Sequence, residues 1–349
     1  MGPSLTATIS IVTIAHTALR FSLSTGAYCD VTHERQIIHT VCALCGANDA
    51  ERLYRGLPVM CCRRCGLAYC HPQPSEADLA ALYSDDYFTS AAHDGEPAYI
   101  DNREGFERFF DICLRRLERL VKPGRLLEVG SGLGYYVHVA TQRGWDAVGV
   151  ELSDFAARHA REQLGADVRT GILAEAGFAD ASFDAVVMRD VLEHVREPQA
   201  TLAEAHRVLR PHGVLSLSVP NFACANRRLA GPHWRLLCPE QHLFHFTPDT
   251  LTRLLDQCGF AIVHASTRYD SPATREAYSA LATPGARRSL AWHAALRGDV
   301  VFLPLGSNVR RLLRAATIVL AALARPFRDR LKDDILEVHA RKQPCPNTT

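Results

Sequence analysis

The sequence predicts an α/β fold: an open, parallel, doubly wound sheet that is preceded by a small cysteine-rich module. From residue 125 onward, short apolar runs suited to buried strands alternate with the patterns of amphipathic helices. A glycine-rich turn joins the first of these strands to its helix, and two Cys-x-x-Cys pairs come before it.

Composition restricts what such a fold can do. The chain has 349 residues, enough for one large domain or two to three smaller ones, and 47% of them are hydrophobic. The formal net charge of +1 gives no basic surface for nucleic acid. Cysteine pairing in Cys-x-x-Cys units, within a total of 12 cysteines, indicates metal in a reducing compartment and not a disulfide scaffold.

The N-terminal part divides into an extension and a metal module. Residues 1–38 are rich in Ser, Thr and Ala, and we expect them to be poorly ordered. Residues 39–73 predict a zinc ribbon, because thiolates three apart on a tight turn can face one tetrahedral ion and the following glycine permits that turn. Redox pairs or free thiols are the alternative. The four predicted ligands of a structural ion are Cys42, Cys45, Cys62 and Cys65.

Residues 74–122 predict linking helices between this module and the sheet. One helix is expected over Ser75–Tyr83. A longer one is expected from Tyr99 to Val121, where apolar residues recur at four- and three-residue steps until Pro123-Gly124 ends the pattern. The longer helix should cover one face of the sheet.

The glycine turn is the most informative stretch for function. Residues 126–134 read Leu-Leu-Glu-Val-Gly-Ser-Gly-Leu-Gly, so an acid at a strand end precedes three alternating glycines. Such glycines let the backbone approach a ligand, and the helix expected over Tyr135–Arg143 points its amide groups at it. A dinucleotide fingerprint requires a third glycine three residues after the second, and Tyr135 occupies that place.

The alternation of strands and helices continues to the C-terminal end. The next strand ends on Glu151, about twenty residues beyond the turn, where an acid can accept both hydroxyls of a ribose. Ser153 caps the following helix, which runs to about Leu164. The strand that leads to Glu151 is Asp146–Val150. Further expected strands are Ser182–Met188, Val214–Val219, one that starts with Gly259–Val263, and Ile335–Ala340, and further helices are Pro198–Leu209 and Thr250–Cys258.

The acid-x-Gly-x-Gly-x-Gly form resembles motif I of the class I S-adenosylmethionine (SAM) methyltransferases. Phe183-Asp184, a helix start at Leu192-Glu193-His194, and Arg-Val-Leu-x-Pro-x-Gly at 207–213 follow in the order typical of that family. The resemblance covers roughly residues 125–267. It implies a seven-stranded Rossmann-like sheet within residues 123–342. Between the sixth strand and the last one we expect an unusual helical insert at about 272–332, and residues 343–349 form a tail. The contacts that the resemblance implies for SAM are Glu128, Gly130, Ser131, Gly132, Gly134, Glu151, Leu152, Ile172 and Asp190.

Two details leave alternatives open. Relatives usually carry an acid or amide after the third strand, where this chain has Thr170 to Ala174, so backbone groups would have to read the adenine. Asp190 is placed either at the mouth shared by adenine and acceptor or as a helix N-cap. The order after the ribbon is similar to a bacterial subgroup in which Tyr83 and Tyr87 would lie over the cofactor as a lid; the alternative is that they pack the ribbon on the domain.

The loop at 222–246 should form the acceptor side of the site. Its His-Leu-x-x-Phe-Thr phrase resembles sugar-modifying members of the family, which implies His242 as base and Glu240 as orienting or substrate-binding acid. The alternative is that the histidines of this loop bond it to the fold. His194 lies in the recurrent Leu-Glu-His phrase, and a role in the fold or at the cofactor mouth is favoured over catalysis.

The function predicted from these features is methyl transfer from SAM to a small molecule: a sugar, nucleotide sugar or glycan precursor. An RNA methyltransferase with a zinc module and a non-catalytic SAM-fold binding protein are the alternatives; the near-neutral charge argues against nucleic acid. The expected location is the cytoplasm. The apolar segment at 312–324, with arginines on both sides, would place residues 310–330 on the inner face of a membrane, or in a buried or dimer contact. The oligomeric state is left open.

Overall fold

The computed structural model describes residues 41–90, 98–268 and 333–343, all of which belong to one compact unit. The predicted extension at 1–38, the predicted insert at about 272–332 with its apolar segment, and the tail beyond residue 343 lie outside the described residues. Among the residues that are described, no helix is both long and apolar enough to cross a membrane.

The seven-stranded sheet predicted from the sequence is confirmed. Its order is β10-β11-β8-β7-β4-β5-β6, and only β11 runs against its neighbours. The strands are β4 (Arg125–Val129), β5 (Asp146–Glu151), β6 (Val168–Thr170), β7 (Phe183–Arg189), β8 (Leu209–Pro220), β10 (Phe260–Arg268) and β11 (Ile335–Lys342).

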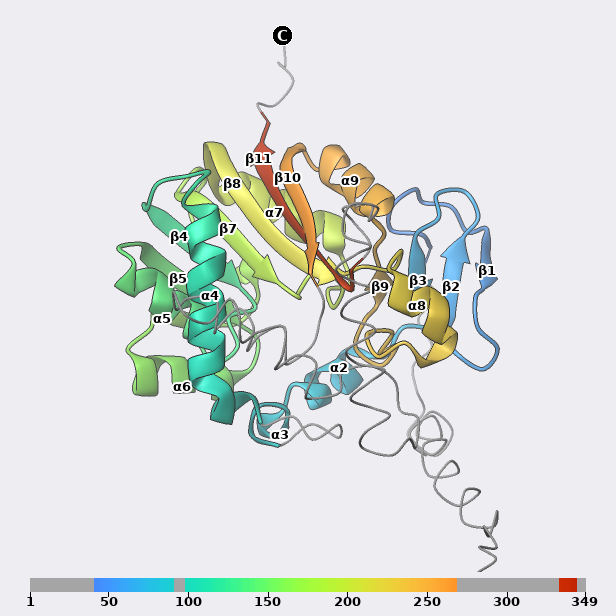
Figure 1. The fold of residues 1–349 in the computed structure, drawn as a ribbon, viewed down its shortest axis with the longest axis horizontal. Helices are drawn as coiled ribbons and strands as arrows, with labels where there is room; N and C mark the ends of the chain where they lie inside the picture. The colour runs from blue at the N-terminus through green and yellow to red at the C-terminus, as the bar shows by residue number, and fades with distance from the viewer. Residues whose placement is uncertain (1–40, 91–97, 269–332, 344–349) are drawn as a thin grey trace, which may run out of the picture. The chain divides into compact units, whose positions relative to one another are not determined.

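Helices cover both faces of this sheet (Figure 1). Alternate residues of one strand point to opposite faces, so Leu126 of β4 joins one apolar cluster and Leu127 joins the other. The first cluster includes residues of α4 (Arg103–Leu117), α5 (Tyr135–Gln142) and α6 (Asp154–Leu164). The second includes residues of α7 (Pro198–Val208) and α9 (Pro248–Gln257).

Two expected helical segments differ from the sequence prediction. The helix expected from Tyr99 to Val121 is divided into a 3-10 turn, η3 (Tyr99–Asn102), and α4. The helix start expected at Leu192-Glu193-His194 is a turn, closed by the His194 amide on the Val191 carbonyl (2.9 Å). The Glu193 carbonyl accepts from the amides of Leu243 (2.8 Å) and Phe244 (3.2 Å), and this long-range pairing replaces a helical bond.

The cysteine module is a second, four-stranded antiparallel sheet in the order β1-β2-β3-β9. Its strands are β1 (Ala50–Arg52), β2 (Val59–Cys62), β3 (Ala68–Cys70) and β9 (Phe244–His245). The last strand comes from the long loop after β8, so that loop is built onto the module. The short helices are α2 (Glu76–Leu82), α3 (Asp85–Thr89), α8 (Ala225–Ala230), η4 (Leu173–Glu175) and η5 (Gly231–His233).

The links between the two sheets follow from local sequence. Ser75 and Asp78 form a capping box that starts α2 directly after the module. Figure 1 shows α2 and α3 at the carboxyl ends of the parallel strands. In an open parallel sheet this is the edge at which ligands bind.

Candidate functional site

The glycine turn has a backbone that only glycine adopts at little cost. Gly130, Gly132 and Gly134 have φ of +71°, +51° and +81°. A Cβ on Gly130 would lie 2.5 Å from Cγ2 of Val191, and one on Gly134 would lie 2.4 Å from Cβ of Ala160. Packing therefore closes the first and third glycine positions to any larger residue.

Gly132 faces the interior of the candidate site. The nearest atoms to a Cβ there would be the Tyr99 hydroxyl (3.7 Å) and a ring carbon of Phe88 (3.8 Å). The Ser131 amide donates to the Val150 carbonyl (3.2 Å) and so ties the turn to β5. Phe88 and Tyr99 thus cover the turn; both were assigned to linking helices from the sequence, where nothing placed them over the glycines.

Two carboxylates lie beside the turn, each at the end of a strand. Glu151 accepts from the amides of Gly132 (2.7 Å) and Ser153 (2.8 Å), one on each oxygen. Burial raises the pKa of Glu151, and these amide bonds partly oppose the rise. Burial and then repulsion by Glu151 raise the pKa of Glu128 well above its usual range. Glu128 is 2% exposed, and its Oε2 has no hydrogen-bond partner among the described residues.

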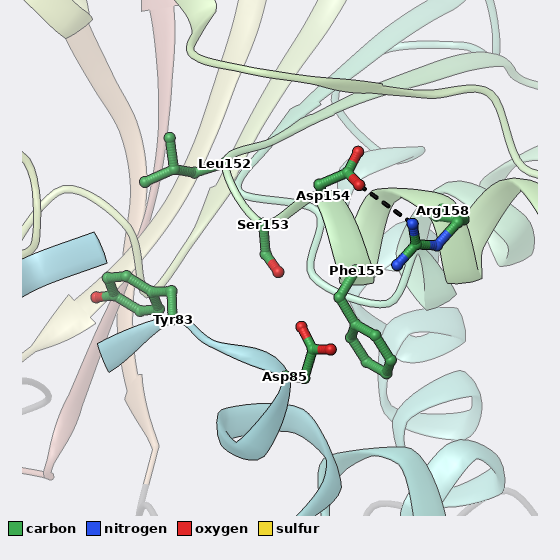
Figure 2. A pocket seen from close by; sticks show the side chains of 7 residues that line it. All are labelled: Tyr83, Asp85, Leu152, Ser153, Asp154, Phe155 and Arg158. Carbon is green, nitrogen blue, oxygen red and sulfur yellow. Dashed lines mark hydrogen bonds and ion pairs between the residues drawn. The ribbon is translucent and has the colours of Figure 1, made fainter. Parts of the chain in front are cut away.

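A cavity of about 350 Å³ opens next to Glu151 (Figure 2). Ser153 and Asp85 point toward each other across it, and an ion pair joins Asp154 to Arg158 at 3.3 Å. The residues that line it are Tyr83, Asp85, Leu152, Ser153, Asp154, Phe155 and Arg158. Sequence reasoning named only Leu152, Ser153 and Tyr83 of this set, although the first turn of α6 directly follows Glu151.

Apolar side chains stay exposed at this edge of the sheet. Leu152 is 53% exposed and Ile172, after β6, is 46% exposed. The segment around Ile172 holds no acid, as its sequence indicated. Exposed large apolar residues that gather at a concave site are typical of ligand contact.

Asp190 lies at the end of β7 with φ of +55°, and its Oδ1 accepts from the Ser218 hydroxyl at 2.9 Å. Its Oδ2 lies 3.7 Å from the Arg268 guanidinium. The N-cap alternative for Asp190 is wrong, because a turn and not a helix follows it.

His242 of the long loop lies against the turn that holds His194. The rings of His194 and His242 meet edge to face, with centroids 4.7 Å apart. Nδ1 of His242 lies 2.8 Å from the Leu236 carbonyl, and Nδ1 of His194 lies 3.1 Å from the Gln241 carbonyl. Burial, and then His242, lower the pKa of His194 to about 3.

The two acids near these histidines differ in burial. Glu193 is fully buried, and its carboxylate lies within 4.8 Å of the ring nitrogens of both histidines. Burial raises the pKa of Glu193 well above its usual range. Glu240, which the sequence placed beside His242, is exposed on the loop.

Tyr83 connects the cavity to the histidines. Its hydroxyl lies 2.8 Å from Nδ1 of His194 and points away from Asp85 and Ser153 in Figure 2. Tyr87 packs edge to face on Tyr83 at 5.4 Å and is 42% exposed.

The four predicted cysteine ligands converge in the module. The Sγ atoms of Cys42 and Cys65 lie 3.3 Å apart, and those of Cys45 and Cys62 lie 3.5 Å apart. A tetrahedral zinc ion with Zn–S bonds of about 2.3 Å places its sulfurs about 3.8 Å apart, so a small opening of the cluster accommodates the ion.

The two knuckles of the cluster match each other. The Gly46 and Gly66 amides donate to the carbonyls of Cys42 and Cys62 at 2.8 Å in both cases. Both glycines have positive φ, +68° and +80°. Cys61 lies outside the cluster, with its thiol directed to the Gly66 carbonyl (3.8 Å).

Comparison with known proteins gives one family match. Residues 101–265 match the family described as "Methyltransferase domain". This range extends from η3 into β10 and includes the glycine turn, Glu151, His194 and His242. It also includes the cavity-lining residues of 152–158, but not Tyr83 and Asp85.

Similar curated proteins carry consistent names. A Mycolicibacterium smegmatis protein named "Probable S-adenosylmethionine-dependent methyltransferase" is 29% identical over 167 residues, which cover 48% of this chain. The chain spans 63% of that relative, less than two thirds of its length. An O-methyltransferase of Aspergillus nomiae is 29% identical, over 55% of this chain and 92% of its own. A ubiquinone biosynthesis O-methyltransferase of Hahella chejuensis is 34% identical over 111 residues, which cover 30% of this chain and 47% of that protein.

Proposed function

We propose, on the premise that this chain carries a class I SAM-dependent methyltransferase domain, that the protein transfers a methyl group from SAM to a hydroxyl of a small molecule. The observation that carries the proposal is the junction of the glycine turn, Glu151 and the 350 Å³ cavity at the carboxyl edge of the sheet. Each oxygen of Glu151 accepts one amide bond and keeps a second lone pair, which suits two ribose hydroxyls.

The remaining contacts of the donor follow from this placement. The methionine part would lie over Gly130, Ser131, Gly132 and Gly134, beneath Phe88 and Tyr99. The unpartnered Oε2 of Glu128 supports a place for the donor's ammonium group. Exposed Leu152 and Ile172 would flank the adenine, and Asp190 would face its outer edge.

Acceptor chemistry requires alignment and the removal of a proton. A sulfonium already activates its methyl group, so holding the acceptor in line supplies much of the acceleration. We place the acceptor beside His242 as the base. The Leu236 carbonyl accepts from Nδ1 of His242, so Nε2 carries the electron pair that takes the proton. Exposed Glu240 would bind the acceptor at the mouth.

The acceptor class is proposed as a sugar, nucleotide sugar or glycan precursor. Two relatives are named O-methyltransferases, which favours oxygen as the attacked atom. The four-cysteine cluster is proposed to hold structural zinc, which would fix the module that supplies β3 as the partner of β9. We place the protein in the cytoplasm, where zinc thiolates persist.

The test begins with calorimetry of SAM binding. Glu151→Gln loses a charged acceptor of ribose bonds, worth about 1.5–3 kcal/mol, so SAM affinity should fall about 10- to 150-fold. Glu162→Gln, on the exposed side of α6, is the matched control and should bind as the wild type does. Equal affinity in all three proteins would refute the assigned donor site.

Methyl transfer is tested with labelled SAM against nucleotide sugars, extracted lipids and RNA in parallel. Label should enter the sugar fraction. His242→Asn should lower kcat about 10²- to 10⁴-fold with unchanged SAM affinity, because a base acts only in the chemical step. His233→Ala, exposed on the same loop, is the control. Label in RNA alone would replace the proposed acceptor class.

A further inference from the structure

Three adjacent side chains lie at the edge of the site, and the proposed methyl transfer uses only one of them, His242. Glu193, His194 and His242 each place a metal-binding atom within 4.8 Å of the other two. Glu193 and His194 lie in the turn after β7, and His242 lies in the loop before β9. The Leu243 amide donates to the Glu193 carbonyl at 2.8 Å and holds the two segments together.

The ring nitrogens are prepared for coordination. Nδ1 of His242 lies 2.8 Å from the Leu236 carbonyl, and Nδ1 of His194 lies 3.1 Å from the Gln241 carbonyl. A carbonyl oxygen can only accept, so the bond to Leu236 puts the proton of His242 on Nδ1 and its electron pair on Nε2. Nδ1 of His194 faces two oxygens, the Gln241 carbonyl and the Tyr83 hydroxyl, and the tautomer that donates to both leaves the electron pair on Nε2. Histidines that bind metals usually donate their other N–H to a backbone carbonyl or a carboxylate in this way.

Glu193 supplies the independent observation. Its side chain is fully buried, and neither carboxylate oxygen has a hydrogen-bond partner among the described residues. A buried carboxylate without a partner costs several kcal/mol. Its Oε1 lies 3.9 Å from Nε2 of His194, so the unpartnered oxygen faces the same point as the histidine electron pair.

We propose that Glu193, His194 and His242 bind one divalent transition-metal ion, separate from the ion of the four-cysteine cluster. Two imidazole nitrogens and one carboxylate oxygen form a donor set that suits Zn²⁺ or Fe²⁺ and not the all-oxygen preference of Mg²⁺ or Ca²⁺. Three protein ligands leave a coordination position open. The Tyr83 hydroxyl, 2.8 Å from Nδ1 of His194, orients that ring from the opposite side.

The bound ion has a consequence that rests on the proposed function, although the site itself does not. A cation on Nε2 of His242 takes the electron pair that would otherwise accept the acceptor's proton. A cation held there would lower the pKa of an acceptor hydroxyl at the open position, so that the hydroxyl could release its proton to solvent and not to His242. In the metal-bound protein, the ion and not His242 would then activate the acceptor, as a Lewis acid beside His242.

The experiment compares zinc content after full-length protein is equilibrated with Zn²⁺ and freed of excess metal. Wild type should contain one zinc equivalent per chain more than Glu193→Gln, and His242→Asn should lose the same equivalent. Glu193→Gln keeps the side-chain shape and replaces a buried carboxyl group, whose pKa burial raises, with a neutral amide, so it should fold; circular dichroism checks this. Exposed His233→Ala should keep the wild-type zinc content.

Thermal unfolding gives a second readout. Zn²⁺ added to protein depleted by a chelator should raise the Tm of wild type more than that of Glu193→Gln, because only wild type binds the ion at this site. Equal zinc content and equal Tm response in wild type and Glu193→Gln would overturn the proposal. A zinc difference without methyl transfer to any fraction would keep the metal site and refute the proposed function.

Discussion

At the scale of single residues, a substitution of Gly132 should reduce SAM binding much more than it reduces the stability of the fold. A Cβ there meets nothing closer than 3.7 Å, so Gly132→Ala should fold and lose about 1–2 kcal/mol to its positive φ. The added methyl group would occupy the space between the turn and Phe88 that we assign to the donor. SAM affinity should fall tenfold or more, measured by calorimetry.

Gly165→Ala is the matched control for this change. Gly165 also has positive φ, +62°, but it ends α6 and its Cβ position meets no atom within 4 Å, whereas that of Gly132 faces Phe88 and Tyr99. The two variants should show similar losses of Tm, while only Gly132→Ala loses SAM affinity. Wild-type affinity in Gly132→Ala would contradict the placement of the donor.

Sequence patterns predicted those parts of the site whose residues lie close together in the sequence. The three glycines, Glu151 and the four cysteines were identified from spacing, and the structure brings each set together. Glu193 was not singled out, because its Leu-Glu-His phrase predicted a helix start. Its burial arises from contact with residues about fifty positions later, and spacing within a segment cannot show such contact.

At the scale of elements, the cysteine module depends on two knuckles that a metal ion would join. Cys42→Ser should remove one zinc equivalent and lower the Tm markedly, because structural zinc contributes directly to folding. The loss should extend to the loop of β9, which pairs with β3. Elemental analysis and thermal unfolding measure the two effects.

Cys61→Ser provides the control within the same strand. Cys61 precedes Cys62 directly, yet its thiol is directed to the Gly66 carbonyl and not to the cluster. This variant should keep its zinc and most of its stability. Loss of zinc from Cys61→Ser, or its retention in Cys42→Ser, would contradict the assigned ligands.

Long elements were predictable and short ones were not. The strands and helices of the large sheet have strong apolar periods, so their type was predictable, and the bounds of α7 lie within one residue of the expected ones. Strand β8, however, begins at Leu209 and not at the expected Val214. Strand β9 has two residues, too few for any period, and exists because β3 offers an edge. The turn at 191–194 deviates from the expected helix because distant amides occupy the Glu193 carbonyl.

At the scale of the whole molecule, a buried ion network joins four elements. Glu337 of β11 contacts Arg116 of α4 (2.7 Å), Arg189 of β7 (2.9 Å) and Arg268 of β10 (3.1 Å). Arg268 also reaches Asp190 at the site. The network therefore connects the C-terminal strand to the helical layer and to the candidate site, a link that no local pattern predicts.

The network predicts how stability depends on pH. Burial opposes the charge of Glu337, but Arg189 and Arg268 outweigh it and hold the pKa at about 2, below the ordinary value of 4.5. A carboxyl group whose pKa is lower in the folded than in the unfolded protein stabilises the fold at any pH above its unfolded pKa. For Glu337 this contribution to stability is lost as the pH falls from about 4.5 toward 2. Glu337→Gln should cost about 3–5 kcal/mol at neutral pH, because it removes the carboxylate that pairs with the buried guanidinium of Arg189, whereas Arg268 keeps its longer contact with Asp190. The difference in the free energy of unfolding between this variant and wild type, measured by urea unfolding, should narrow below pH 4.5.

Asp146→Asn is the control. It removes an exposed ion pair with Arg125 and should cost about 0–1 kcal/mol. A pH-independent difference between wild type and Glu337→Gln would show that the carboxylate is not charged in the folded protein.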